Sequence, residues 1–167
     1  PTEATGNLLA EQQALHDFFM KSPGIFCILR GPTLIFELIN PTAINLIGNR
    51  DLVGKPLREA MPELAAQGFF DLLDNVYTSK SPFKGNEVKV FIKGASGDME
   101  TLYINLIFQP ILNAQDESTG ILVSGHEVTE QVLARNLVTQ REEQYKFIIE
   151  ATQLATWDIN PQTNQLY

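Results

Sequence analysis

The sequence predicts an α+β fold: a five-stranded antiparallel sheet with helices on one face, preceded by an N-terminal helix and followed by a C-terminal linker helix. Two features of the 167-residue chain predict it. The strand-like runs are joined in hairpins by short turn sequences, and the helical stretches are grouped between the second and third strands. Hairpins make neighbouring strands antiparallel, whereas a parallel sheet would need a helical crossover after each strand.

The N-terminal part predicts one helix and one hairpin. The first helix is expected within the segment 1–22, with Asn7 as its N-cap. It should end at the turn of residues 22–24, where Pro and Gly break the helical periodicity. Runs typical of β-strands follow at residues 25–29 and 33–39. The connection between them is so short that we expect an antiparallel hairpin.

Helical segments fill the stretch between this hairpin and the next strands. Residues 40–47 predict a short helix, because Asn40 is a good N-cap and Pro41 fits the first helical turn. Residues 51–61 contain Gly and Pro and predict irregular single turns. Residues 62–79 predict a longer helix with its apolar side chains on one face.

Three strands and a linker helix complete the pattern. The strands are predicted at residues 86–93, 99–112 and 120–127, and the turn between the first two consists of residues that accept a positive φ. A helical pattern then extends from residue 129 to about residue 152. The predicted domain limits are 1–22 for the first helix, 23–128 for the sheet domain, 129–152 for the linker and 153–167 for the start of a second domain.

Three stretches of this pattern resemble the PAS family. Residues 34–43 (LIFELINPTA) look like the second strand of that family running into its Asn-Pro helix start, and residues 47–55 are similar to the turn that follows. Residues 120–131 (GILVSGHEVTEQ) resemble its last strand and its terminal Asp-Ile-Thr-Glu signature. The resemblance spans residues 13–131, so a PAS domain is expected at 23–128.

The resemblance implies a sensory or signal-relay module of a two-component-type signalling protein. Glu127, Val128 and Thr129 then form the junction at which the signal leaves the sheet, with Glu127 where the family usually has Asp. A shorter match over residues 143–159 looks like the start of another PAS domain, with a strand at residues 157–159. Tandem PAS domains are common in bacterial sensor histidine kinases, so the resemblance implies a longer parent chain with a kinase or other output domain.

Alternation along the strands selects residues for a ligand pocket. In the second strand Phe36 and Leu38 share one face. In the third strand Val88, Val90 and Ile92 lie opposite charged neighbours. These inward positions, together with apolar residues of the long helix, could line a pocket, and the alternative is an ordinary filled core. The complete set of candidates, with two polar members on the fourth strand, is Phe36, Leu38, Phe69, Leu72, Val88, Val90, Ile92, Tyr103 and Asn105.

The residues argue against a prosthetic group and against catalysis. Flavin-binding relatives use a Cys on a helix, whereas Cys27 lies on a predicted strand, and haem-binding relatives use a His on the long helix, which contains none here. His16 and His126 stand apart without nearby Cys, so no metal site is expected. No Ser-His-Asp, Cys-His or carboxylate pair lies in a catalytic setting, and we expect no enzyme activity. An unidentified small ligand is left open.

Composition restricts the partners. The net charge of −8 disfavours nucleic acid and anionic membrane surfaces, since contacts with phosphate need Lys or Arg. No apolar run is long enough to span a bilayer, and a single cysteine allows no disulfide within the chain. We expect this segment to lie in the cytoplasm. Membrane-spanning segments elsewhere in the parent protein can still anchor that protein in a membrane.

The linker helix carries a marginal dimer seam. One stripe at helical spacing contains Leu133, Leu137 and Phe147 but has Gln140 and Gln144 in its middle. A stable coiled coil prefers an unbroken apolar seam. We therefore expect a parallel homodimer whose helices rotate or shift register to pass on a signal. Two alternatives stay open: the helix packs on its own domain, or the chain is a structural dimerisation spacer with a filled core and no ligand.

Overall fold

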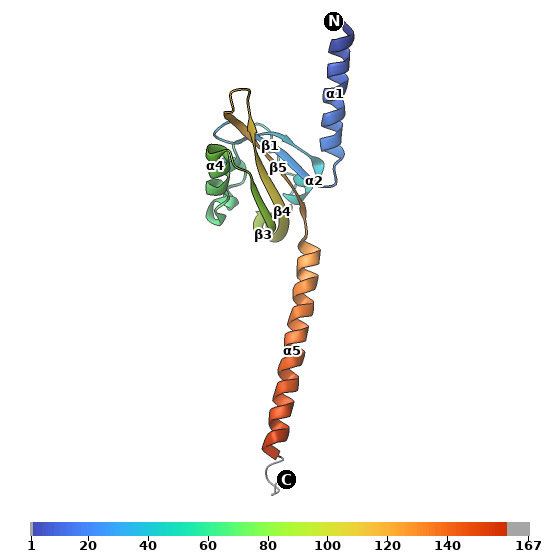
Figure 1. The fold of residues 1–167 in the computed structure, drawn as a ribbon, viewed down its shortest axis with the longest axis vertical. Coiled ribbons are helices and arrows are strands. Elements are labelled where there is room, and N and C mark those ends of the chain that lie inside the picture. Colours follow the sequence, from blue (N-terminus) through green and yellow to red (C-terminus); the bar gives the residue numbers. More distant parts are fainter. Residues whose placement is uncertain (1, 160–167) are drawn as a thin grey trace. The chain divides into compact units, whose positions relative to one another are not determined.

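The computed structural model describes residues 2–159, and the chain divides into two compact units with their boundary between Thr129 and Glu130. The elements are α1 (Thr2–Lys21), β1 (Ile25–Arg30), β2 (Ile35–Ile39), α2 (Pro41–Leu46), α3 (Leu57–Ala60), the 3₁₀ helix η1 (Pro62–Gln67), α4 (Phe69–Ser79), β3 (Phe83–Lys93), β4 (Met99–Leu112), β5 (Ser118–Glu127) and α5 (Thr129–Ile159). Figure 1 shows their succession along the chain.

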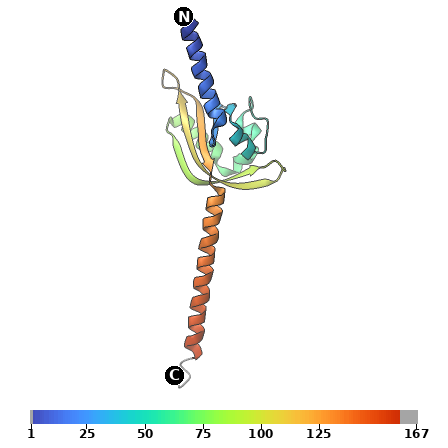
Figure 2. The same cartoon turned by 90° about the vertical axis from the view of Figure 1, so that its right-hand side faces the viewer.

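The five strands form one sheet in the order β2-β1-β5-β4-β3, and every neighbouring pair is antiparallel. The first and last strands, β1 and β5, lie side by side within the sheet (Figure 1). Their register pairs Leu29 with Ile121, whose side chains are only 1% and 0% exposed. Hairpin loops join β3 to β4 and β4 to β5 at opposite ends of the curved sheet (Figure 2). The fold class predicted from the sequence is confirmed.

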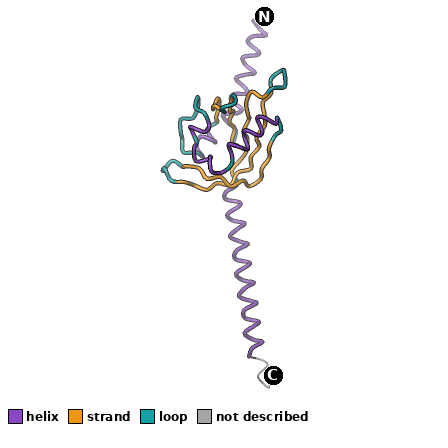
Figure 3. The backbone as a smooth tube through the Cα atoms, turned by 90° about the vertical axis from the view of Figure 1, so that its left-hand side faces the viewer, coloured by secondary structure: helices purple, strands orange, loops and turns teal. Residues whose placement is uncertain are grey.

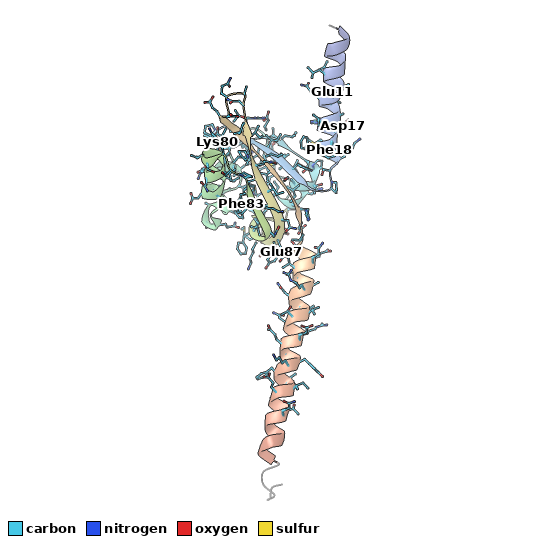
Figure 4. All side chains as sticks on the ribbon, viewed as in Figure 1. Glu11, Asp17, Phe18, Lys80, Phe83 and Glu87 are labelled. Carbon is cyan, nitrogen blue, oxygen red and sulfur yellow. The ribbon has the colours of Figure 1, made fainter. Side chains whose placement is uncertain are left out.

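The short helices lie together on one side of the sheet, which curls round them (Figure 3). Burial along β4 reflects this arrangement, because Leu102, Ile104, Leu106 and Phe108 are buried while the residues between them are not. Alternation of this kind is expected for an antiparallel sheet with one covered face. Phe83 on β3 (Figure 4) extends the core toward its edge, with its ring centroid 5.6 Å from that of Phe108.

Asn40, which has no exposed surface, joins the end of β2 to both α2 and β1. Its side-chain oxygen accepts a hydrogen bond from the backbone N–H of Ala43 at 3.1 Å, which is the N-cap bond of α2. The same oxygen accepts from the N–H of Phe26 at 3.1 Å, and the side-chain nitrogen donates to the Gly24 carbonyl at 2.8 Å. The predicted N-cap is confirmed, and it also fixes α2 against the first strand.

The single helix predicted at residues 62–79 is wrong in its middle. Gly68 has a φ of 81°, in the left-handed region, and divides the segment into η1 and α4. Glycine adopts this conformation without a steric penalty, which is why it commonly ends a helical segment. Two smaller corrections concern α1, which begins before the predicted cap Asn7 because Glu and Ala there favour helix, and α3, a helical turn within the region predicted to be irregular.

The free edge of β2 is covered by the main chain of the loop that follows α2. The N–H of Phe36 donates to the carbonyl of Lys55 at 3.1 Å, and the carbonyl of Phe36 accepts from the N–H of Gly54 at 2.8 Å. The N–H of Leu57 donates to the carbonyl of Leu34 at 2.9 Å. An open strand edge is a template for pairing with another chain, so these main-chain bonds protect β2.

The linker helix α5 is longer than predicted. It continues to Ile159, and the strand predicted at residues 157–159 is therefore wrong. No Gly or Pro interrupts the helical pattern between Thr129 and Pro161, so nothing in the local sequence ends the helix earlier. The rest of the predicted second domain, residues 160–167, lies outside the described residues. Among the helices of the described part, none is long and apolar enough to cross a bilayer.

Candidate ligand cavity

An apolar cavity of about 120 Å³ lies between the inner face of the sheet and the short helices. All five strands and the segments from α2 to α4 contribute to it. Its walls consist of Ile25, Cys27, Leu29, Phe36, Ile39, Ala43, Leu46, Ile47, Leu57, Met61, Leu64, Phe69, Leu73, Val90, Ile92, Ile104, Leu106, Phe108 and Val123. Since none of these side chains carries a charge, an amide or a hydroxyl, the cavity can select a guest only by shape and apolar surface.

Four of the residues predicted for a pocket lie on this wall, namely Phe36, Phe69, Val90 and Ile92. Each was selected by strand alternation or by its position on the long helix. The structure brings them together from β2, α4 and β3. These elements are far apart in the sequence, so the sheet topology is what makes them neighbours.

Leu38 lies off the wall because β2 contains a bulge. Cys27 pairs with Ile39 and Leu29 pairs with Phe36, so β2 has one more residue than β1 between the same two pairs. The extra residue shifts the alternation by one position. Ile39 therefore takes the inward place that the regular pattern assigns to Leu38, which is only partly buried.

Leu72 and Val88 are partly buried beside the core but do not line the cavity. On α4 the inward position is Leu73, one turn after Phe69, because the helix begins only after Gly68. On β3 the pairing with β4 is irregular between Gly85 and Val88. Both differences arise from local irregularities of the backbone, which a prediction based on regular periodicity does not include.

Tyr103 and Asn105 lie on the opposite face of β4 from the cavity. Asn105 is fixed there, because its side-chain oxygen accepts a hydrogen bond from the N–H of Glu87 at 2.8 Å. Its side-chain nitrogen lies 3.4 Å from Nε2 of His126. Glu87 belongs to the bulged part of β3 (Figure 4) and has a φ of 52°. The polar candidates thus support the sheet and cannot contact a guest in the cavity.

Cys27 is a wall residue that the pocket prediction did not include. The alternation of Ile25, Cys27 and Leu29 along β1 is the signal that could have identified it. Burial raises the pKa of the Cys27 thiol to about 12, so the sulfur stays protonated and uncharged at neutral pH. It contributes a small apolar surface to the cavity.

The predicted signal junction is anchored to β4. The N–H of Val128 donates to the carbonyl of Tyr103 at 2.7 Å, and the N–H of Tyr103 donates to the hydroxyl of Thr129 at 3.0 Å. Glu127 is exposed at the end of β5. Val128 and Thr129 therefore continue the contact of β5 with β4 up to the first residue of α5.

The free edge of β3 is covered by side chains. Gln67 forms two hydrogen bonds with the main chain of Phe91, donating to its carbonyl at 2.7 Å and accepting from its N–H at 2.8 Å. Glu63 accepts from the N–H of Lys93 at 3.0 Å. The guanidinium of Arg50 forms an ion pair with both oxygens of Glu63 and donates to the Lys93 carbonyl at 2.6 Å.

Glu63 is held in its charged form by these contacts. Burial alone raises its pKa, but hydrogen bonds from Arg50 and from the N–H of Lys93 lower it by more, so the pKa lies below the ordinary value of 4.5. Arg50 also donates to the carbonyls of Ile47 and Ala60 at 3.0 and 3.2 Å. The ion pair thus connects the loop after α2, the end of α3, η1 and the edge of the sheet.

No group of three or more His, Cys, Asp or Glu side chains is placed to hold a metal ion within residues 2–159. The two histidines of the sequence, His16 and His126, lie on α1 and at the end of β5. The cavity, the junction and the side-chain closure of β3 are therefore the features from which a function can be argued.

Comparison with known proteins identifies the fold. The family model described as PAS fold matches residues 19–133. The PAS domain of BvgS from Bordetella pertussis is 20% identical, with a TM-score of 0.57 over 80% of this chain and 98% of that one. Two further structures share the fold: VqmA bound to DPO (18% identical, TM-score 0.52) and an RNA-binding light-oxygen-voltage receptor (14% identical, TM-score 0.59). The matched regions cover 70% and 86% of this chain, respectively. This chain spans only 57% and 38% of the lengths of those two proteins. The chain belongs to the PAS family.

Proposed function

We propose that this PAS domain is a sensory or signal-relay module that binds a small apolar molecule in its cavity and transmits the bound state through α5. The observation that carries the proposal is the apolar cavity of about 120 Å³ at the centre of the domain. A purely structural spacer has no need of such a space, because a packed core without voids is more stable.

The size of the cavity restricts the class of ligand. An apolar cavity of about 150 Å³ accepts benzene or xenon, whereas sites for drug-sized ligands measure roughly 300–1,000 Å³. A cavity of about 120 Å³ therefore suits an uncharged molecule of a few heavy atoms, unless the walls move apart. A charged ligand is disfavoured, because the wall offers no polar group that could offset the free-energy cost of removing the charge from water.

Transmission through α5 is supported by the surface of that helix. Leu133, Leu137 and Phe147 are 54%, 50% and 71% exposed, so the apolar stripe predicted from the sequence is available to a partner. We propose that a second copy of the chain covers it in a parallel homodimer. The polar positions Gln140 and Gln144 would keep this seam weak enough to change register.

The proposed module has no catalytic role of its own and passes its state to an output domain of the same parent chain, of the histidine kinase type or another. We place it in the cytoplasm, for which the single free cysteine, Cys27, is compatible support. No haem, flavin or metal is proposed, because Cys27 lies on β1 and the helix before β3 offers no His.

Binding of small apolar compounds tests the sensory role. We expect benzene and similarly small hydrocarbons to shift the methyl NMR signals of residues on the cavity wall and to raise the melting temperature. Ala43→Leu adds three carbons at the wall and should abolish both effects, whereas Ala10→Leu, the same change on the exposed surface of α1, should leave them intact. Absence of any shift in the unsubstituted chain would favour the spacer.

The oligomeric state tests the relay. Sedimentation of the chain at high concentration should show a dimer that Leu137→Glu weakens, because a charge in the seam opposes association. A strict monomer at high concentration would remove the proposed homodimer while leaving the binding of ligands to be judged by its own experiment.

A further inference from the structure

The 3₁₀ helix η1 separates the cavity from solvent beside β3. Leu64, near its centre, is 8% exposed and lines the cavity together with Val90 and Ile92 of β3. η1 has six residues, whereas 3₁₀ helices seldom exceed three or four because their hydrogen bonds are poorly aligned. A segment of this kind is held in place mainly by its contacts and only weakly by its own backbone.

The contacts of η1 with β3 are made by side chains. Gln67 forms its two hydrogen bonds with the main chain of Phe91, and Glu63 accepts from the N–H of Lys93. These bonds alternate along β3 with the apolar wall residues Val90 and Ile92. Because solvent lies next to the Gln67 bonds, water can replace both of them when η1 moves away, and the Arg50–Glu63 ion pair must separate in the same movement.

The C-terminal end of η1 provides a hinge. Gly68 has a φ of 81°, and a Cβ at this position would meet no atom within 4 Å. The chain can therefore change direction here without a steric clash and without disturbing α4, which begins at the next residue. By contrast, α2 is fixed by the buried Asn40, and the loop at the edge of β2 is fixed by main-chain bonds.

We propose that η1 is the lid through which a guest reaches the cavity, that Gly68 is its hinge, and that Gln67 is its latch. The inference rests on the proposed ligand-binding function for its biological meaning, but the movement itself needs no ligand. Two hydrogen bonds exposed to water hold the latch, so their removal should increase the open population about tenfold.

The chain contains a natural reporter for this movement. Cys27 is its single cysteine, is buried and lies on the cavity wall. Methyl methanethiosulfonate is small enough to follow an apolar guest through an open lid. When the lid opens, water reaches the Cys27 thiol and takes its proton. The thiolate then attacks the sulfenyl sulfur of the reagent, which forms a Cys27–S–S–CH₃ disulfide and releases methanesulfinate. The labelling rate, followed by mass, then reports how often the cavity opens.

The decisive variant is Gln67→Met, which keeps the length of the side chain but removes the donor and acceptor that bind Phe91, together with the bond from the same nitrogen to the Glu63 carbonyl within η1. We expect it to label about tenfold faster than the unsubstituted chain at the same pH. The matched control is Gln13→Met on α1. The Gln13 side chain donates a hydrogen bond to Asp17 at 3.0 Å, and neither residue lines the cavity. Cys27 in this control variant should be labelled at the same rate as in the unsubstituted chain.

Denaturant distinguishes lid opening from global unfolding. Opening of one short segment exposes little surface, so the faster labelling of Gln67→Met should depend only weakly on urea. Equal rates in the two chains would overturn the lid. So would an increase that merely equals the loss of global stability and shares its full dependence on urea.

Amide exchange in the unsubstituted chain gives a second measurement, independent of any variant. The N–H groups of Phe91 and Lys93, which are bonded to Gln67 and Glu63, should exchange through an opening that leaves the β4 amides protected. If these two amides exchange only when the whole domain unfolds, the lid is wrong. Suppose that Gln67→Met is labelled faster, as expected, but that the chain binds no apolar compound. This result would support the lid movement and contradict only the proposed sensory function.

Discussion

The two edges of the sheet are closed in different ways. At β2 the closing groups are peptide N–H and carbonyl groups of residues 54–57, whereas at β3 they are the side chains of Arg50, Glu63 and Gln67. Every residue except Pro brings the same main-chain groups, so the closure of β2 tolerates most substitutions. The closure of β3 depends on residue identity and, through Glu63, on pH. A domain that needs one firm wall and one movable wall can obtain both from this difference.

The largest effect is expected where the β2 side does rely on a side chain. Asn40→Ala removes three hydrogen bonds in a fully buried position and leaves the N–H groups of Phe26 and Ala43 without their partner. The free energy of unfolding should fall by about 3 kcal/mol, measured by urea denaturation. Asn113→Ala, the same change in an exposed hairpin loop, should cost less than half as much. Equal losses would show that burial of Asn40 is unimportant.

Removal of the charged group from the β3 edge comes next. Glu63→Ala leaves the Arg50 guanidinium and the Lys93 N–H without their acceptor, and we expect a loss of about 2 kcal/mol. Glu59→Ala, at an exposed position of α3 four residues earlier, is the control and should change stability by less than about 0.5 kcal/mol. The two edges would have to be considered equivalent if both variants behaved alike.

The same residue gives the β3 edge a pH dependence. The pKa of Glu63 in the folded chain is lowered from 4.5, so its contribution to stability is fully present above that pH and is lost as the pH falls through the lower folded value. Glu63→Gln should therefore be less stable than the unsubstituted chain at pH 7, and the gap should narrow on acidification below about pH 4.5. A gap that stays constant between pH 7 and pH 3 would contradict the assignment.

A moderate effect is expected from the backbone of the β2 edge. Gly54 has a φ of 89°, and a Cβ there would meet no atom within 4 Å, so Gly54→Ala is penalised by conformation alone. We expect a loss of about 1 kcal/mol in urea denaturation. A larger loss accompanied by aggregation would indicate that the loop had left the β2 edge open.

The smallest effect sharpens the comparison most directly. Lys55 bonds β2 through its carbonyl, so Lys55→Ala should change the free energy of unfolding by less than about 0.5 kcal/mol. Gln67→Ala removes side-chain bonds at the other edge and should cost about 1–2 kcal/mol. The predicted difference disappears if Lys55→Ala is as destabilising as Gln67→Ala in the same denaturation experiment.

Much of the fold follows from local patterns in the sequence. Alternation and flanking turn residues agree at residues 99–112, and the strand they predict has the observed limits of β4. The helix predicted at 62–79 failed at Gly68, since its apolar periodicity continues across a residue whose left-handed φ interrupts the backbone. The strand predicted at 157–159 rests on the turn residues at 160–164 and on the family resemblance, but the helix that precedes it continues through these residues.

The site was predictable only where alternation is regular. Phe36, Val90 and Ile92 reach the cavity as expected, whereas Leu38 does not, because a bulge is a property of two paired strands and cannot be detected in one strand alone. The latch formed by Gln67 could not be foreseen, since it depends on the approach of η1 to β3 in three dimensions.

The bulge in β2 has a consequence for how such a domain can diversify. Loss of the codon for Glu37 would leave only Leu38 between the two fixed pairs, so β2 would straighten while Phe36 stayed opposite Leu29 and Ile39 stayed opposite Cys27. Gain of a codon here would enlarge the bulge and bend the strand further. Insertions and deletions at this position therefore offer evolution a route to a new cavity shape in which no wall residue is itself replaced.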